Sequence, residues 1–325
     1  MRQSPNFFRA AAAVILSAVI WSFAAVPAFA WPERTVRFIV PLGPGSGVDI
    51  TARLLGDTLS KKWGQAVVIE NRPGGDGIIA ITGFISANDD HVLLFTPTGA
   101  FSSHPYTQEK MPYDPAALTP IARVTTTIIG FAVPVSTGVN SMKELLDKVR
   151  AEPGKLNWAS ATAANEFAFQ GYLKENKLDM VKVPYRDTVS AINDLGEGRI
   201  QMYVGAYAIM RPQVQAGKVK VLAVTNRDRA KGAPDIPTAA QAGFPKLQFD
   251  GLVGIFGPAK MPVAVRAQIA ADARQALADP AIAEKLTATG QNISPGTAAE
   301  FAAAQKAQTD QIDGVAKLLG LKRAQ

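Results

Sequence analysis

The chain has 325 residues, of which 47% are hydrophobic, and a formal net charge of +7. It contains no cysteine, which excludes disulfides, cysteine-based metal sites and a thiol nucleophile. The basic excess is small and scattered, so we expect no nucleic-acid partner. The length predicts two domains or one large domain.

Residues 1–30 have the pattern of a secretory signal peptide. Arg2 and Arg9 precede an apolar run over 10–25, and Ala28-Phe29-Ala30 follows it. This order of a charged region, an apolar region and a small-residue cleavage site is typical of exported proteins. We therefore expect a soluble mature protein in the periplasm, with cleavage after Ala30.

The next stretch organises the rest of the chain. An apolar run over 38–40 predicts a buried strand, and the Pro41 to Gly47 loop interrupts regular structure. We expect Asp49 to cap the helix that follows, whose start would present free N–H groups to an anion. A dinucleotide-binding loop is the weaker alternative, because its G-x-G-x-x-G spacing would need glycine or alanine at Ile50. A βα turn without a ligand also stays open.

Further strand–loop–helix units follow in order. The expected strands lie at 66–70, 91–96, 128–133, 156–160, 180–184, 200–204, 219–225 and 252–256, with helices at 78–87, from Ser141, at 167–173 and at 189–195, an extended segment at 112–123 and an alanine-rich helical part at 262–321. Alternating strands and helices predict parallel sheets, where ligands bind outside the carboxyl ends of the strands.

The expected fold is α/β, with two lobes around a ligand cleft. The first series has too few helices to cover its sheet, and the last helices have no sheet of their own, so we expect the C-terminal part to return to the first lobe. The predicted division is a signal peptide at 1–30, lobe 1 at 31–124 plus 251–325, and lobe 2 at 125–250. Two crossover strands would join the lobes, as in solute-binding proteins that close by hinge motion.

The sequence offers little for catalysis. His91 and His104 are the only histidines, and we expect both in loop or surface positions without a metal. No G-x-S-x-G elbow occurs. A hydrolase or isomerase acting on a carboxylate, through Ser46 or paired acids such as Asp187 and Asp194, is the alternative to a binding protein. A docking protein without a ligand is a third class. We expect neither cofactor nor metal.

Several motifs resemble one known family. They are Val36 to Asp49, Val68 to Gly75, Met111 to Pro115, Pro153 to Asn157, Val183 to Arg186, Gln215 to Thr225 and Asp235 to Thr238. In this order they resemble the Bug-type extracytoplasmic solute receptors, the periplasmic binding proteins of tripartite tricarboxylate transporters.

The resemblance implies a type II periplasmic-binding fold, no catalysis, a small carboxylate ligand and the membrane subunits of such a transporter as partners. We also expect a monomer. Gly45, Ser46 and Gly47 would give backbone donors to one carboxylate, Thr98 and Gly99 would complete that side, and Ser160 and Thr162 would close from the other lobe. The full expected ligand-binding set is Leu42, Gly45, Ser46, Gly47, Asp49, Thr96, Thr98, Gly99, Ala100, Ser160, Thr162, Asn165, Tyr185, Arg186, Thr188 and Gly205.

The chain also departs from the family pattern. Gly205 stands where the family commonly has an acid, and Ile78 replaces the asparagine of a usual Gly-Asn pair. Loss of the acid disfavours an amino-acid ligand, because an ammonium group would lose its partner. We expect a diacid with an apolar middle, including aromatic diacids, while citrate-like and malate-like acids stay open. Arg186 is expected at the rim of the cleft.

Overall fold

The computed structural model describes residues 31–160, 162–185 and 188–324. Residues 34–325 form one compact unit that contains two β-sheets. Among the described residues, no helix is both long and apolar enough to cross a membrane.

The first sheet has the strand order β11-β4-β10-β3-β1-β2. Its strands are β1 (Val36–Val40), β2 (Val67–Asn71), β3 (Val92–Pro97), β4 (Leu118–Thr127), β10 (Gly251–Pro258) and β11 (Gln291–Gly296). β1 pairs in parallel with β2 and β3, so the carboxyl ends of these three strands share one edge. The helices α2 (Gly47–Trp63), α3 (Ile78–Ala87) and α4 (Gly99–Thr107) begin at that edge.

The second sheet has the order β7-β6-β8-β5-β9. Its strands are β5 (Ile129–Pro134), β6 (Asn157–Ser160), β7 (Val181–Lys182), β8 (Met202–Ala206) and β9 (Val219–Val224), and its helices are α5 (Met142–Ala151), α6 (Ala163–Glu175), α7 (Thr188–Gly196) and α8 (Tyr207–Gln215). β6 is parallel to β7 and β8. Trp158 and Phe169 are buried in its core, where their rings meet edge to face at 4.9 Å.

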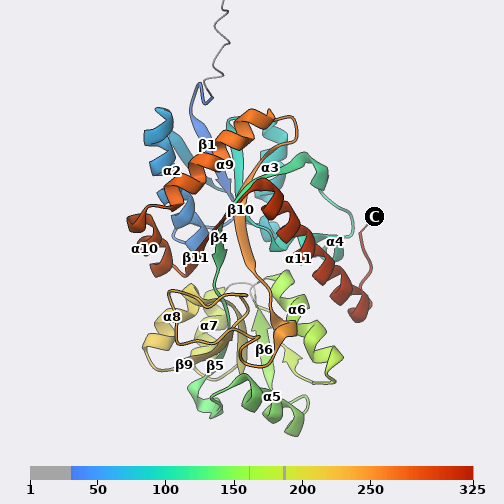
Figure 1. Cartoon of the computed structure of the whole chain (residues 1–325). Helices are drawn as coiled ribbons and strands as arrows, with labels where there is room; N and C mark the ends of the chain where they lie inside the picture. Colours follow the sequence, from blue (N-terminus) through green and yellow to red (C-terminus); the bar gives the residue numbers. More distant parts are fainter. Residues whose placement is uncertain (1–30, 161, 186–187, 325) are drawn as a thin grey trace, which may run out of the picture. The chain divides into compact units, whose positions relative to one another are not determined.

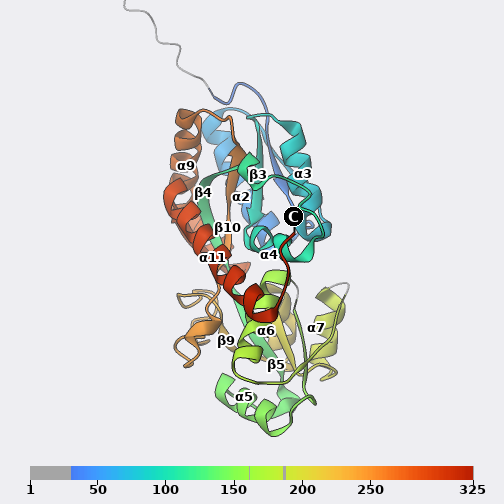
Figure 2. The same cartoon turned by 90° about the vertical axis from the view of Figure 1, so that its right-hand side faces the viewer.

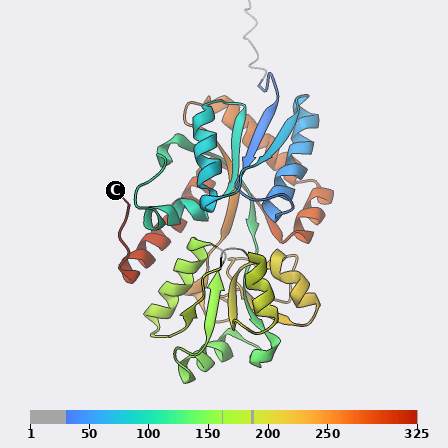
Figure 3. The same cartoon turned by 180° about the vertical axis from the view of Figure 1, so that it is seen from behind.

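The chain passes between the sheets twice. It leaves the first sheet between β4 and β5 and returns between β9 and β10 (Figure 1). The last helices, α9 (Val263–Leu277), α10 (Pro280–Ala288) and α11 (Ala298–Leu319), belong to the first sheet, where α9 and α11 pack on β4. Figure 2 shows these two helices on the opposite side of the sheet from α3, and Figure 3 shows the orange and red C-terminal helices beside the blue and cyan elements. The predicted return of the C-terminal part is confirmed, while the exact lobe boundaries stay a prediction.

Three local predictions were wrong. The part over 262–321 is not all helical, because it contains the edge strand β11. The helix α8 after β8 was missed; Pro212 inside it and its single fully buried side chain, Met210, weaken its helical signal. The cap of α2 is Ser46 rather than Asp49: the Ser46 Oγ accepts a hydrogen bond from the Asp49 N–H at 3.2 Å.

Two helices link the sheets by direct packing. Phe167 of α6 and Ile312 of α11 share one buried apolar cluster with Phe249, which precedes β10. A Cβ atom added at Gly171 in α6 would lie 2.7 Å from Val315 of α11, so a larger residue there would push the helices apart. The contact places the start of α6 close to the edge of the first sheet where α2, α3 and α4 begin.

Candidate ligand-binding site

The start of α2 presents backbone donors at the carboxyl end of β1. Ser46 has extended backbone angles and its hydroxyl caps the helix, as described above. Among the described residues, the N–H groups of Gly47 and Val48 have no hydrogen-bond partner. Two free N–H groups at a helix N-terminus favour an anion, both by hydrogen bonding and by the helix dipole.

Asp49 holds the α2 loop in place. Its side chain is only 2% exposed, and its carboxylate accepts hydrogen bonds from the Gly45 N–H at 2.8 Å, Asn71 Nδ2 at 2.8 Å and Arg53 Nε at 3.1 Å. Burial alone would raise the pKa of Asp49, but the hydrogen bonds from Arg53, Asn71 and Gly45 outweigh it and leave the pKa lowered. The Gly45 N–H is therefore committed to Asp49, which corrects its expected role as a ligand donor. The Leu42 carbonyl accepts from the same Asn71 amide at 2.9 Å.

The start of α4 repeats this arrangement at the end of β3. The Thr98 hydroxyl, fully buried, donates to Gln308 Oε1 at 2.6 Å, and its N–H donates to the Leu252 carbonyl. The side chain of Thr98 is thus committed within the protein, against the expectation that it would contact the ligand. Gly99 and Ala100 follow it, and their N–H groups have no partner in the described part of the chain. The Thr96 hydroxyl donates to the Pro97 carbonyl at 3.0 Å.

The first turn of α6 approaches α4 from the second sheet. A Cβ atom added at Gly99 would lie 3.3 Å from the Cβ of Ala164 in the first turn of α6. Thr162 caps α6 with its hydroxyl and is exposed, and Ser160 donates to the Val204 carbonyl at 3.0 Å. Asn165 is buried and lines a small cavity of about 10 Å³ together with Phe131 and Phe249.

The remaining expected residues that the structure describes lie around β7, β8 and α7. The Tyr185 hydroxyl donates to Asp194 Oδ2 at 2.6 Å, and burial together with this bond raises the pKa of Tyr185 to about 12. Thr188 begins α7 and is half-buried, whereas Arg186 lies outside the described residues. At Gly205 an added Cβ would lie 2.5 Å from the Tyr203 ring, which explains why this position does not carry the acid of the family pattern.

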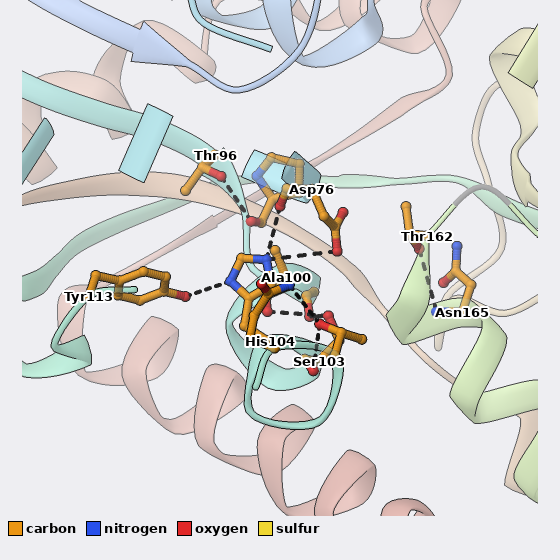
Figure 4. A network of polar contacts seen from close by, with 12 residues as sticks. Asp76, Thr96, Ala100, Ser103, His104, Tyr113, Thr162 and Asn165 are labelled. Atoms are coloured by element: carbon orange, nitrogen blue, oxygen red, sulfur yellow. Dashed lines mark hydrogen bonds and ion pairs between the residues drawn. The ribbon is translucent and has the colours of Figure 1, made fainter. Parts of the chain in front are cut away.

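His104 is buried, which contradicts its expected loop position. Its Nδ1 lies 2.8 Å from the Tyr113 hydroxyl and its Nε2 lies 3.1 Å from the Asp76 carbonyl (Figure 4). A carbonyl only accepts, so Nε2 carries the proton and Nδ1 accepts from Tyr113. Burial lowers the pKa of His104, so the ring is neutral at pH 7. His91 is buried as well, at 6% exposure.

One group among the described residues has ligand atoms close enough to hold a metal ion. The oxygens of Asp89 and Asp90 and a ring nitrogen of His91 all lie within 4.8 Å of one another. They precede β3, at the end of the strand opposite to the α4 loop, and Asp89 is paired with Arg34 at 2.7 Å. This group is therefore separate from the loops of the expected site.

Sequence reasoning missed four residues at this edge: Asp76, His104, Gln291 and Gln308. The two glutamines come from β11 and α11, and no local signal connects them with loops more than two hundred residues earlier. Gln291 accepts from the Thr125 hydroxyl at 3.0 Å, and its Nε2 would lie 2.7 Å from a Cβ at Gly47. Asp76 lies in the glycine-rich stretch between β2 and α3, to which the sequence analysis assigned no ligand contact.

Comparisons with known proteins identify the family of the chain. The model of the tripartite tricarboxylate transporter family receptor matches residues 51–321. A UPF0065 protein from the tcbD-tcbE intergenic region of Pseudomonas sp. (strain P51) is 30% identical over 286 residues, which cover 86% of this chain and 85% of that protein. The chain belongs to this family of solute-binding receptors, which are not enzymes.

Solved structures give the same fold. R. palustris Rpa4515 with adipate is 25% identical with a TM-score of 0.79, and covers 90% of this chain and 99% of its own. MatC from Rhodopseudomonas palustris with bound malate is 26% identical with a TM-score of 0.74, and the match covers 88% of this chain and 99% of MatC. The periplasmic binding protein BugD is 26% identical with a TM-score of 0.75, and the match covers 90% of this chain and 99% of BugD. The fold is thus the α/β, two-lobed fold of periplasmic binding proteins, as the sequence predicted.

Proposed function

We propose that this protein is a periplasmic receptor that captures a small di- or tricarboxylate and delivers it to the membrane subunits of a tripartite transporter. The observation that carries the proposal is the pair of helix starts, α2 and α4, whose first N–H groups have no partner among the described residues. Relatives solved with adipate and malate support a dicarboxylate. We place the ligand carboxylates at the N–H groups of Gly47 and Val48 and of Gly99 and Ala100.

The second sheet would supply the other side of the site. Thr162 is the exposed hydroxyl at the start of α6, next to the α4 loop, and Thr188 begins α7. Neutral donors suit a receptor that must release its cargo, since burying an ion pair carries a large desolvation cost. Aromatic diacids stay among the expected ligands. We expect Arg186 to contribute at the rim of the site, without being required.

The localisation and assembly belong to the same proposal. The signal-like residues 1–30 predict export, with cleavage after Ala30 to leave Trp31 at the N-terminus. We also expect a monomer, with lobe 1 at 31–124 plus 251–325 and lobe 2 at 125–250. The intact mass of protein isolated from the periplasm tests the cleavage, and a mature chain that still contains Arg9 would refute it.

A thermal-shift screen tests the ligand class directly. The purified mature protein is melted with mono-, di- and tricarboxylates and with their matched amides. Because a ligand that binds only the native state stabilises it by about 4 kcal/mol at a thousand times its dissociation constant, acids should raise the melting temperature and amides should not. A screen in which amides work as well as acids would contradict anion recognition.

Paired variants at Gly47 test the backbone donors. An added Cβ there meets Gln291 and the Thr289 carbonyl, so Gly47→Val would disturb the protein itself and is a poor test of ligand approach. Gly47→Ala adds the same Cβ but keeps the N–H, whereas Gly47→Pro removes the N–H at a helix position that tolerates proline. We expect Gly47→Pro to bind a dicarboxylate about tenfold or more weakly than Gly47→Ala. Equal affinities, or complete loss of binding in Arg186→Gln, would show that the ligand is held elsewhere.

A further inference from the structure

The glycine-rich loop between β2 and α3 carries an acid, Asp76, in an unusual backbone conformation. Asp76 lies in the 3-10 turn η1 (Gly75–Gly77) between β2 and α3, at φ 51° and ψ 36°. This left-handed region is uncommon for residues other than glycine, although aspartate tolerates it better than most. A Cβ at the adjacent Gly77 would lie 3.5 Å from Pro41, so the acid stands beside the loop that leads into α2.

Buried neutral groups hold this loop in position. The Asp76 carbonyl accepts from His104 Nε2 at 3.1 Å, and His104 in turn accepts from Tyr113 at 2.8 Å. Tyr113 packs edge to face on Phe101 of α4. The contact to His104 uses the backbone of Asp76, so the position of the loop does not depend on the Asp76 side chain.

Within the described part of the chain, the Asp76 carboxylate has no cationic partner. The His104 ring, 3.8 Å away, is its only neighbour at ion-pair distance among the residues that the structure describes, and that ring is neutral. The side chain is 40% exposed, and its carboxylate lies on the side of the network away from Tyr113 (Figure 4). Burial raises the pKa of Asp76 to about 6, so the group is mostly ionised at pH 7.5. An ionised carboxylate can only accept hydrogen bonds.

We propose that Asp76 is a specificity-determining residue that accepts a hydrogen bond from the ligand, so that the receptor selects carboxylates bearing a hydroxyl or ammonium group. This inference rests on the proposed function, because it assumes that a carboxylate occupies the adjacent helix starts. A ligand with a donor satisfies Asp76, whereas a plain diacid places its own charge near an unpaired carboxylate. Asp76, beside the first sheet, would thus supply the acid that the family pattern has at the position of Gly205 in the second sheet.

Calorimetric titration of matched acids tests the proposal. The probes are succinate, malate and aspartate, and the longer set adipate, 2-hydroxyadipate and 2-aminoadipate, each at pH 7.5. In at least one set, the wild-type protein should bind the hydroxy or amino acid about tenfold or more tightly than the plain diacid. Asp76→Gly removes the acceptor and suits the left-handed backbone, and Asp76→Asn removes only the charge. Both keep the carbonyl that contacts His104.

The expected result in the variants is a specific change in preference. Asp76→Gly should bring the acids of a set within about threefold of one another, by strengthening the plain diacid and weakening the donor-bearing one. Asp76→Asn should lose the preference for the amino acid in particular, because it cannot balance an ammonium charge. Titrations in two buffers of different ionisation enthalpy give the number of protons that the protein and ligand take up when they bind.

Two outcomes would overturn the inference. Equal binding of plain and donor-bearing acids by the wild type shows that Asp76 does not read the ligand. Binding of the plain diacid with uptake of one proton, lost in Asp76→Asn, shows that Asp76 is instead accommodated in its protonated form. If none of the acids binds wild type or variants, although all melt cooperatively, the proposed function itself fails.

Discussion

Asp49, in the first turn of α2, and Asp76, in the turn before α3, lie at the same edge of the first sheet, yet their environments are opposite. Asp49 is 2% exposed, has three donors, and its pKa is lowered. Asp76 is 40% exposed, has no cationic neighbour in the described chain, and its pKa is raised to about 6. Asp49 holds the site together through hydrogen bonds within the protein, whereas Asp76 is free to contact a ligand. The amino-acid type is the same in both cases, so the sequence alone does not distinguish these roles.

Removing the Asp49 carboxylate, which is hydrogen-bonded within the protein, should have the largest effect on stability. Asp49→Ala leaves the Gly45 N–H, the Asn71 amide and Arg53 without their acceptor, and we expect a loss of about 3 kcal/mol of unfolding free energy. For a chain of this size that lowers the melting temperature by roughly 5–10 °C. Asp57→Ala, at an exposed position of the same helix, is the matched control and should change little. Equal effects of the two variants would show that Asp49 does not hold the loop.

The buried hydrogen bond from Thr98 to Gln308 should also contribute to stability. Thr98→Val removes the donor to Gln308 while keeping the side-chain shape, and leaves a buried amide oxygen unpaired at a cost of about 2 kcal/mol. Urea unfolding of Thr98→Val, Gln308→Leu and the double variant gives the coupling energy. Thr58→Val, which removes a hydroxyl bonded only to its own helix, is the control. A coupling energy near zero would contradict the assignment.

The same distinction explains what the sequence could predict. The strand–loop–helix order and the helix over 78–87 follow from local periodicity, and α3 begins and ends where expected. Partners brought from far along the chain, such as Gln308 for Thr98, leave no local trace. That Ser46 rather than Asp49 caps α2 could not be predicted either, because both residue types cap helices and only the hydrogen bond from the Asp49 N–H to the Ser46 Oγ decides between them. Burial of His104 likewise depends on Tyr113, nine residues later.

Tyr113 tests whether the Asp76 loop is held by the histidine. Tyr113→Phe keeps the ring contact with Phe101 but removes the donor to His104 Nδ1, and we expect a loss of about 1.5 kcal/mol. Because the Asp76 carbonyl still requires a donor, the His104 ring should keep its proton on Nε2, which nitrogen NMR shifts report directly. A proton on Nδ1 in either protein would mean that the loop is not held through this ring.

The smallest expected effect has the opposite sign and depends on pH. The folded-state pKa of Asp76, about 6, is higher than its ordinary value of 3.8, so the folded protein binds this proton more tightly than the unfolded chain does. Its relative stability is therefore greatest below pH 3.8 and is lost as the pH rises through 6. Asp76→Asn imitates the protonated form, so at pH 7.5 it should be more stable than wild type by about 1 kcal/mol, a figure reduced because the side chain is partly exposed to solvent. Paired melts from pH 4 to 7.5 should show this advantage shrinking towards zero at pH 4.

The contribution of Asp49 to stability changes with pH in the opposite direction. Because its pKa is lowered in the folded state, Asp49 stabilises the fold at pH values above its ordinary pKa, and this contribution is lost as the pH falls. An Asp76→Asn protein whose advantage is constant with pH would show that the carboxylate is solvated in the free receptor, and the contrast between the two acids would then be one of position alone.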